Sequence, residues 1–396
     1  MSARPAAAHG AGWALLAGNF AIGCGVMVVP GSLNDLVRSL DVSVALGGQL
    51  IALAAVVMAV GAPLAAGFVA GIDRRRLLAL TLAWYAIGHA LSALAPSYAA
   101  LAPLRAATVL GAAIFTPQAA AAIGTMTPPE QRGRAITFIF LGWSMASVLG
   151  MPLHSYIGEA FGWRWAFALV ALLSAAGALW VWRAMPDGVK PPAMSLAAWR
   201  EVFTHPVLMA IVFVTALSGA GQFTLFSYFA PYFRHVLDAS AAEVSFMFFW
   251  FGAFGFAGNV LVSRHIDRIG AGGAVTALLA LMSLSLLAWP WAGSVAAIAA
   301  VLVPWALGCF SSNSAQQARL GVAAPALAPA LMALNTSAIY LGQAVGAAGG
   351  GALVAARGDY AALPWVGLAW LAAAIALSAW AARAARAAQR GDSKNR

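Results

Sequence analysis

The side chains with the strongest chemical demands in this sequence are ionisable groups inside apolar runs. Arg105 lies several residues within the apolar stretch 98–126, and a cation in a hydrocarbon layer costs at least about 2.5 kcal/mol. It should therefore face water or a partner, and we take it as the best single candidate for a functional residue. The alternative is an arginine that extends its head group to the edge of the layer and only anchors its helix.

Groups that could carry a proton are few. Asp35 lies near the outer end of the first apolar run, Glu243 at the start of the eighth, His154 in the fifth and His89 in the third. A carboxylate or an imidazole can alternate between a neutral and a charged form, as proton transfer requires. A structural role is the favoured interpretation for each of these groups, and Asp35 and His154 are the most suitable carriers among them.

Neutral polar side chains spaced through the apolar runs form a second set of candidates. Small-molecule sites combine apolar and aromatic walls with a few polar groups, and amides, which donate and accept, suit neutral heteroaromatic rings or sugars. About half of these side chains are expected only to bond neighbouring helices, at about 0.6 kcal/mol per contact. Gln222, between glycine and phenylalanine residues at mid-run, is the strongest candidate in the set Asn19, Thr116, Gln118, Trp143, Gln222, Thr224, Tyr228, Asn313, Gln316, Asn335, Tyr340 and Gln343.

Patterns typical of enzymes do not occur in the sequence. We find no H-E-x-x-H, no Walker loop, no paired acids and no Cys/His set at ligand spacing. The two cysteines, Cys24 and Cys309, fall inside apolar runs and are expected to be small core residues rather than a disulfide. We therefore expect no catalytic residue, no metal and no cofactor.

The elements that must position these side chains are membrane helices. The chain has 396 residues, of which 62% are hydrophobic and only 9% charged, whereas soluble domains carry about 25% charged residues. Lipid tolerates only helices and closed barrels, and apolar runs near 20 residues favour helices over the strands of about 10 residues found in barrels. The fold class is an all-α integral membrane protein with twelve predicted helices, near 12–33, 43–69, 76–95, 98–126, 135–157, 164–183, 207–232, 243–263, 272–290, 294–318, 327–353 and 362–382.

Two features predict that the helices form two six-helix halves. The longest polar connection is rich in proline and glycine, which predicts an N-terminal half at 1–183, a linker at 184–206, a C-terminal half at 207–382 and a basic tail at 383–396. The sequence after the second helix, G-F-V-A-G-I-D-R-R-R (Gly67–Arg76), is echoed after the eighth by S-R-H-I-D-R-I-G (Ser263–Gly270). Such an echo half a chain apart is expected of a duplicated six-helix unit.

The distribution of positive charge predicts the orientation. The termini and the loops on their side hold 17 of the 22 Lys and Arg residues, so both termini are expected in the cytoplasm. The net charge of +10 is spread over short loops and a tail that suits anionic lipid headgroups. A nucleic-acid partner is therefore not expected.

The two echoed loops and the fifth helix carry candidate conformational elements. Asp73 with Arg74 and Arg75, and Asp267 with Arg268, could bond helix ends and hold one conformer, with Glu130, Arg132 and Arg134 as further partners; the alternative is charge anchoring alone. In the fifth helix, Gly142, Ala146 and Gly150 form a small-residue face, and Pro152 loosens the segment beyond it. Plain close packing is the other explanation of that spacing.

Several longer motifs extend these observations over essentially the whole chain. They are V-V-P-G-S-L-N-D-L, the D-R-R-R loop, P-P-E-Q-R-G-R-A-I (Pro128–Ile136), L-G-W-S-M-A-S-V-L-G-M-P-L (Leu141–Leu153), F-G-W-R-W-A-F, F-S-Y-F-A-P-Y-F (Phe226–Phe233) and L-N-T-S-A-I-Y-L-G-Q-A-V-G (Leu334–Gly346). With these motifs the sequence resembles the major facilitator superfamily, specifically the drug:proton antiporter group and its bacterial branch of purine, sugar and chloramphenicol exporters.

The resemblance implies a central cavity lined by helices 1, 4, 7 and 10, with helices 3, 6, 9 and 12 outside, and alternation between inward-open and outward-open forms. The G-M-P stretch with Gly150 and Pro152 matches the antiporter signature, and Arg105 the arginine of the R-x-x-x-G motif, where Val109 replaces the glycine. The sequence departs from the pattern at Ala70 and Gly71 and at Val26, where many relatives have an acid.

These expectations combine into one functional hypothesis. The chain is expected to be a secondary active transporter in the bacterial inner membrane, a monomer that exports a small nucleobase-, nucleoside-, sugar- or drug-like molecule. Exchange for protons follows from the resemblance alone. An importer on the same fold is the alternative, which the direction of flux would distinguish.

Overall fold

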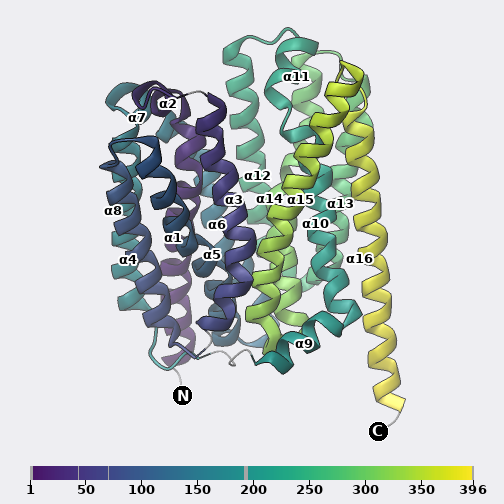
Figure 1. Ribbon diagram of the computed structural model, residues 1–396. Helices are drawn as coiled ribbons and strands as arrows, with labels where there is room; N and C mark the ends of the chain where they lie inside the picture. The colour runs from purple at the N-terminus through teal and green to yellow at the C-terminus, as the bar shows by residue number, and fades with distance from the viewer. Residues whose placement is uncertain (1–2, 43, 70, 191–194, 395–396) are drawn as a thin grey trace. The chain divides into compact units, whose positions relative to one another are not determined.

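Helices make up all the regular structure that the computed structural model describes, which covers residues 3–42, 44–69, 71–190 and 195–394 (Figure 1). The described part of the N-terminal region contains α1 (Ala3–Gly31), α2 (Leu33–Ser39), α3 (Val44–Phe68), α4 (Arg74–Ala93), α5 (Tyr98–Met126), η1 (Pro129–Gln131), α6 (Arg132–Met145), η2 (Ala146–Gly150), α7 (Met151–Phe161) and α8 (Trp163–Ala184). It is followed by α9 (Leu196–Thr204), α10 (Pro206–Phe226), α11 (Phe229–Val236), α12 (Ala241–Ile269), α13 (Ala271–Ala288), η3 (Trp289–Trp291), α14 (Val295–Ala323), η4 (Pro325–Leu327), α15 (Ala328–Arg357) and α16 (Leu363–Lys394).

Eleven stretches of these helices are long and apolar enough to cross a membrane. The one predicted helix without a counterpart among these stretches is the third, 76–95, which corresponds to α4; α4 has 20 residues but begins with three arginines. The predicted all-helical architecture is confirmed, and some predicted spans prove to be composite. The fifth divides into α6, the π-helical η2 and α7, and the seventh divides into α10 and α11.

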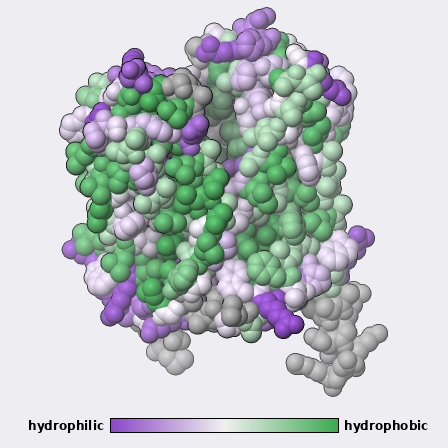
Figure 2. Space-filling model, in the orientation of Figure 1, coloured by the Kyte–Doolittle hydropathy of each residue, from purple (hydrophilic) through white to green (hydrophobic). Residues whose placement is uncertain are grey.

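Contacts divide the chain into two units, Met1–Ser195 with Ala324–Ser337, and Leu196–Ala323 with Ala338–Arg396. The predicted limits of the linker and the tail stay predictions. In each unit, hydrophobic side chains cover the flanks of the helices and hydrophilic ones gather near their ends (Figure 2). Leu172 and Leu284, which are 68% and 59% exposed, belong to these apolar flanks.

In the first unit α1 packs against α6, η2 and α7 through the predicted small-residue face. A Cβ atom on Gly142 would overlap the carbonyl oxygen of Leu16, and one on Gly150 would lie 3.1 Å from the Cys24 sulfur. Backbones can approach this closely only where side chains are small. The predicted close approach of this face to another helix is confirmed.

In the second unit α15 uses glycines in the same way. Cβ atoms on Gly342, Gly346 and Gly350 would overlap carbonyl oxygens on successive turns of α10, those of Ala216, Ala220 and Thr224. Elsewhere in this unit α13 packs against α14 and α16, and one end is filled by a cluster of rings in which Phe229 stacks on Trp289 at 5.5 Å. These glycines therefore let α15 approach the backbone of α10 closely.

Candidate functional site

Three of the predicted substrate-contacting residues form one hydrogen-bonded network in the first unit. The Thr116 hydroxyl on α5 donates to Asn19 Oδ1 on α1 at 2.9 Å, and Trp143 Nε1 on α6 donates to Thr116 Oγ1 at 3.2 Å. Asn19 also donates to the Ile139 carbonyl at 3.1 Å. Asn19 and Thr116 are buried whereas Trp143 is half-buried, so the two smaller side chains orient the indole.

Gln118 lies two residues beyond Thr116 on α5 and is also buried. Its Oε1 atom has no hydrogen-bond partner among the described residues. A buried amide oxygen without a partner is rare, so this acceptor is available to a water molecule or a ligand.

The predicted residues of the second unit divide between local and interhelical contacts. Gln222 bonds the Ser218 hydroxyl and carbonyl at 3.1 and 3.3 Å within α10, and Thr224 donates to Ala220 O in the same helix. Gln316 on α14 instead donates to the Ile211 carbonyl of α10 at 2.5 Å. Gln316 therefore links α14 to α10, whereas the hydrogen bonds of Gln222 among the described residues stay within α10.

The remaining predicted substrate contacts lie on α14, on α15 and in the turn after α10. The Tyr228 hydroxyl, just beyond α10, donates to the Ala347 carbonyl at 2.6 Å. Asn335 is buried, and Asn313, Tyr340 and Gln343 are half-buried.

Arg105 lies in the interior of the first unit and is only 1% exposed. Its guanidinium donates to the carbonyl oxygens of Gly25 at 2.8 Å and Val26 at 3.2 Å, both on α1. Pro30 lies four residues after Val26 and has no N–H group, so the Val26 carbonyl lacks its usual helical donor. Arg105 therefore supplies a donor to a carbonyl that Pro30 leaves open, and the anchoring alternative does not apply.

His89 faces the interior of the first unit. The resemblance had implied that its helix, the third predicted one, lies outside the helices that line the cavity. It is fully buried, with Nδ1 2.9 Å from the Tyr85 carbonyl and Nε2 3.5 Å from Arg105 Nη1. A carbonyl only accepts and a guanidinium only donates, so we assign the proton to Nδ1 and the lone pair to Nε2. The Tyr85 hydroxyl adds a bond to the Ile22 carbonyl of α1 at 3.1 Å.

Asp35 lies at a helix end rather than in the helical interior. Its Oδ2 atom accepts from the Trp163 backbone N–H at 2.7 Å, and Arg38 pairs with Oδ1 at 3.2 Å. α8 begins at Trp163, and its N-cap is Gly162, which has no side chain and a φ of 97°. Asp35 therefore caps α8 from a different helix, a structural role that sequence spacing does not reveal.

His154 is fully buried on α7 beside the end of α1. A Cβ atom on Gly31 would lie 2.7 Å from the His154 Cβ, so Gly31 makes room for this side chain. Neither ring nitrogen has a hydrogen-bond partner of normal geometry among the described residues.

The D-R-R-R loop of the first unit binds the start of the predicted linker. Asp73 accepts from the Gly188 N–H at 2.7 Å and also caps α4. Arg75 donates to the Trp182 carbonyl at 2.6 Å and pairs with Asp187 at 2.7 Å. The loop therefore ties the end of α8 and the chain after it to the start of α4.

Other members of the predicted loop set lie apart from this contact. Arg74 is buried and donates to the Val69 and Ile72 carbonyls, and Arg132 donates to the Gly124 carbonyl at 2.7 Å. Asp267 and Arg268 are exposed near the end of α12.

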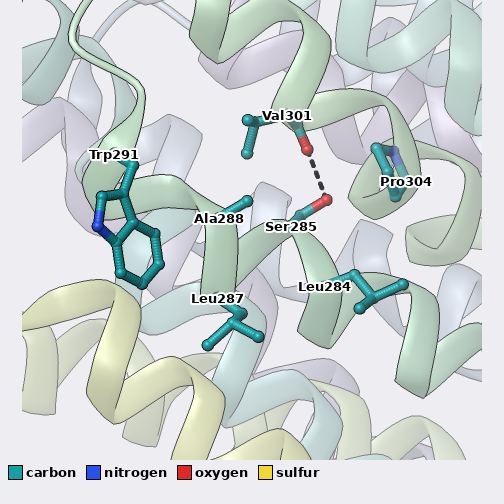
Figure 3. A pocket seen from close by; sticks show the side chains of 7 residues that line it. All are labelled: Leu284, Ser285, Leu287, Ala288, Trp291, Val301 and Pro304. Atoms are coloured by element: carbon teal, nitrogen blue, oxygen red, sulfur yellow. Dashed lines mark hydrogen bonds between the residues drawn. The ribbon is translucent and has the colours of Figure 1, made fainter.

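Sequence reasoning missed a proline break in the second unit. The Ser285 hydroxyl on α13 donates to Val301 O at 2.6 Å (Figure 3) and accepts from the Trp305 N–H at 2.9 Å. In a regular helix the Val301 carbonyl would accept directly from the Trp305 N–H. Here the Ser285 hydroxyl bonds both groups and interrupts the backbone hydrogen bonds of α14 beside Pro304. Pro304 inside an apolar run was the available signal.

An open groove of about 590 Å³ lies beside this break, lined by Leu284, Ser285, Leu287, Ala288, Trp291, Val301 and Pro304 (Figure 3). Its side-chain polar groups are the Ser285 hydroxyl, which is already bonded, and the indole N–H of Trp291. The groove therefore does not suit a polar molecule. Among the described residues there is also no group of three or more His, Cys, Asp or Glu that could hold a metal ion.

Comparison with known proteins places these features in a family. The chain is 29% identical over 355 residues to the inner membrane transport protein YdhP of Escherichia coli, covering 89% of the chain and 91% of that protein. It is 29% identical over 323 residues to a probable sugar efflux transporter of Mannheimia succiniciproducens, covering 81% and 80%.

Solved structures show the same fold. The human organic anion transporter MFSD10 superposes with a TM-score of 0.78 at 18% identity, covering 96% of this chain and all of that one. The proton:xylose symporter XylE superposes with a TM-score of 0.77 at 15% identity, covering 94% and 95%. Residues 15–347 match the Major Facilitator Superfamily, and the chain is a twelve-helix membrane transporter that belongs to this family.

Proposed function

We propose that this transporter exports a small, neutral, polar organic molecule in exchange for protons. The observation that carries the proposal is the network of Asn19, Thr116 and Trp143, in which two buried polar side chains orient a half-buried indole. An aromatic wall with neutral donors and acceptors suits a sugar or a nucleobase better than an ion.

The relatives favour the same substrate class and direction. Several proteins at 27–29% identity are named probable sugar efflux transporters, which supports a sugar as the first substrate to test. The close contact of α1 with α6, η2 and α7, where the antiporter signature resemblance falls, supports export. An importer is the alternative, and the direction of flux would distinguish the two.

The cellular setting is a further proposal, which an inner membrane transport protein among the relatives supports. We propose the bacterial inner membrane, with both termini in the cytoplasm, where the basic loops and tail face anionic lipid. We further propose that a monomer is the working unit, because each family member is expected to contain both halves in one chain.

The experiment begins with a thermal-shift screen of the purified protein against sugars, purines and antibiotics. Each hit is then followed in proteoliposomes, with flux measured in both directions and a pH gradient imposed in either sense. Uphill movement in exchange for protons is the expected result. Transport that is indifferent to the gradient contradicts proton coupling, and uptake together with protons establishes the importer.

A matched pair of variants tests the site. Trp143→Phe keeps an aromatic ring but removes the Nε1 donor that reaches Thr116, and it should weaken binding of the hit about fivefold, since one buried hydrogen bond contributes about 1 kcal/mol. Trp13→Phe changes an indole that is 45% exposed on the flank of α1 and should leave binding unchanged. Equal affinities in the two variants would remove Trp143 from the site.

A further inference from the structure

We propose that His89 is a proton-binding site. Its Nε2 atom can either carry a proton or contact Arg105, but not both at once. This inference rests on the proposed proton-coupled function and names the group that would carry its proton.

The surroundings of His89 leave Nε2 as the ring atom that can take a proton. Nδ1 already bears its hydrogen and points to the Tyr85 carbonyl, while Nε2 faces Arg105 and the Gly25 carbonyl. The groups that face the ring are Arg105 on α5, Tyr85 on its own helix, the Gly25 carbonyl on α1, Phe167 on α8 and, by its charge, His154 on α7.

Arg105 connects this ring to the backbone of α1. The same Nη1 atom that lies 3.5 Å from His89 donates to the Gly25 carbonyl, and Nη2 donates to the Val26 carbonyl. Because Pro30 offers no N–H to Val26, the guanidinium is a structural donor to the outer part of α1. Moving Arg105 would leave an acceptor of α1 unpaired.

Proton uptake therefore requires a change in conformation. A proton from water would add to the Nε2 lone pair and place an imidazolium 3.5 Å from a guanidinium, away from solvent, where like charges repel strongly. The present conformer holds His89 neutral and Arg105 on α1, while a conformer in which Arg105 has withdrawn can take the proton. A group that binds a proton in one conformer but not the other couples the proton to that change.

His89 fits this role better than Asp35. The Asp35 carboxylate accepts a hydrogen bond at the N-terminus of α8, so protonating it would remove the cap. Among the described contacts, Asp35 has none with the Arg105 guanidinium, whereas His89 Nε2 lies 3.5 Å from Arg105 Nη1.

The first experiment does not depend on a substrate. Protein labelled with ¹⁵N-histidine is placed in liposomes and its six histidines are followed by solid-state NMR between pH 8 and pH 5, with the His89 signal identified by its loss in His89→Gln. We expect a neutral imidazole with the proton on Nδ1 at pH 8 and a growing imidazolium fraction at lower pH. A signal that stays neutral throughout, including in Arg105→Gln, would overturn the proposal.

The second experiment measures coupling with a sugar hit from the thermal-shift screen. Glutamine can accept from Arg105 but cannot take up a proton, so His89→Gln should reduce accumulation driven by the pH gradient at least tenfold. His235→Gln, at an exposed site on α11, is the matched control, and monodisperse elution confirms that His89→Gln folds. Undiminished accumulation in His89→Gln overturns the proposal. If the wild-type protein shows no gradient-driven flux, the proposed function fails and the NMR titration still decides whether His89 binds a proton.

Discussion

Replacing Pro30 by alanine would return to α1 an N–H group that can reach the Val26 carbonyl, and this change tests the structural role of Arg105. The backbone stays helical past this point, because the Ser32 N–H bonds the Val28 carbonyl at 3.0 Å. In Pro30→Ala the Val26 carbonyl gains its regular partner, and the bond from Arg105 becomes redundant.

The magnitude follows from the cost of an unpaired buried acceptor. Arg105→Met in the wild-type chain removes the donors to Gly25 and Val26, and leaving one buried acceptor unsatisfied costs about 1–3 kcal/mol. In the Pro30→Ala background the Val26 part of that cost should disappear. A double-mutant cycle should therefore give a coupling free energy of about 1–2 kcal/mol, with Arg105→Met less harmful when residue 30 is alanine.

The assay is reversible unfolding of the purified protein in mixed micelles, with the free energy of unfolding measured for all four variants. The cycle cancels both the intrinsic effect of losing proline and the favourable effect of removing a buried charge. A coupling free energy below about 0.3 kcal/mol, within the usual additivity error, would refute the view that Arg105 compensates for Pro30.

Two of the three further predictions use the same unfolding assay, and the third uses limited proteolysis. Asp35→Ala should lower the free energy of unfolding by about 1 kcal/mol, because α8 loses its cap, whereas Asp35→Asn should lose less; equal losses would mean that the cap bond is not what matters. Gly142→Ala should cost about 1–3 kcal/mol because its Cβ meets the Leu16 carbonyl, while Gly48→Ala, with open space around it inside α3, should stabilise by up to about 1 kcal/mol, and similar values for both would contradict the predicted contact. Arg75→Ala should raise the rate of Lys-C cleavage after Lys190 up to about fivefold, in line with the modest value of exposed ion pairs, and Arg76→Ala should not; no difference between the two would exclude Arg75 as a tie to the linker.

Hydropathy and small-residue spacing predicted much of the fold because both act locally. Each apolar run had to become a helix of spanning length, and the spacing of Gly142, Ala146 and Gly150 places them on one face whatever the partner is. The identity of the facing helix did not follow from the sequence. The overlap with Leu16 joins positions 126 residues apart, and only the folded chain shows it.

The sequence predicted which residues could belong to the candidate site, but not which of them contact one another. Asn19, Thr116 and Trp143 were singled out as polar groups in apolar runs, and their common network became visible only from the structure. Asp35 was considered for its charge, but its partner is a backbone N–H of Trp163, and every residue carries such a group. His89 was set aside by the expected position of its helix, since hydropathy does not report which way one side chain points.

The π-helical segment Ala146–Gly150 gives the fifth span two different angular phases. An α-helix turns by about 100° per residue, and a π turn accommodates one extra residue without lengthening the hydrogen-bonded path in proportion. Deleting one residue from this segment would therefore restore a continuous α-helix and leave His154, with everything else on α7, on its present side. Winding the same number of residues as a regular α-helix would instead turn α7 by about 100° about the helix axis. The inward direction of His154 thus depends on the π turn that absorbs the extra residue.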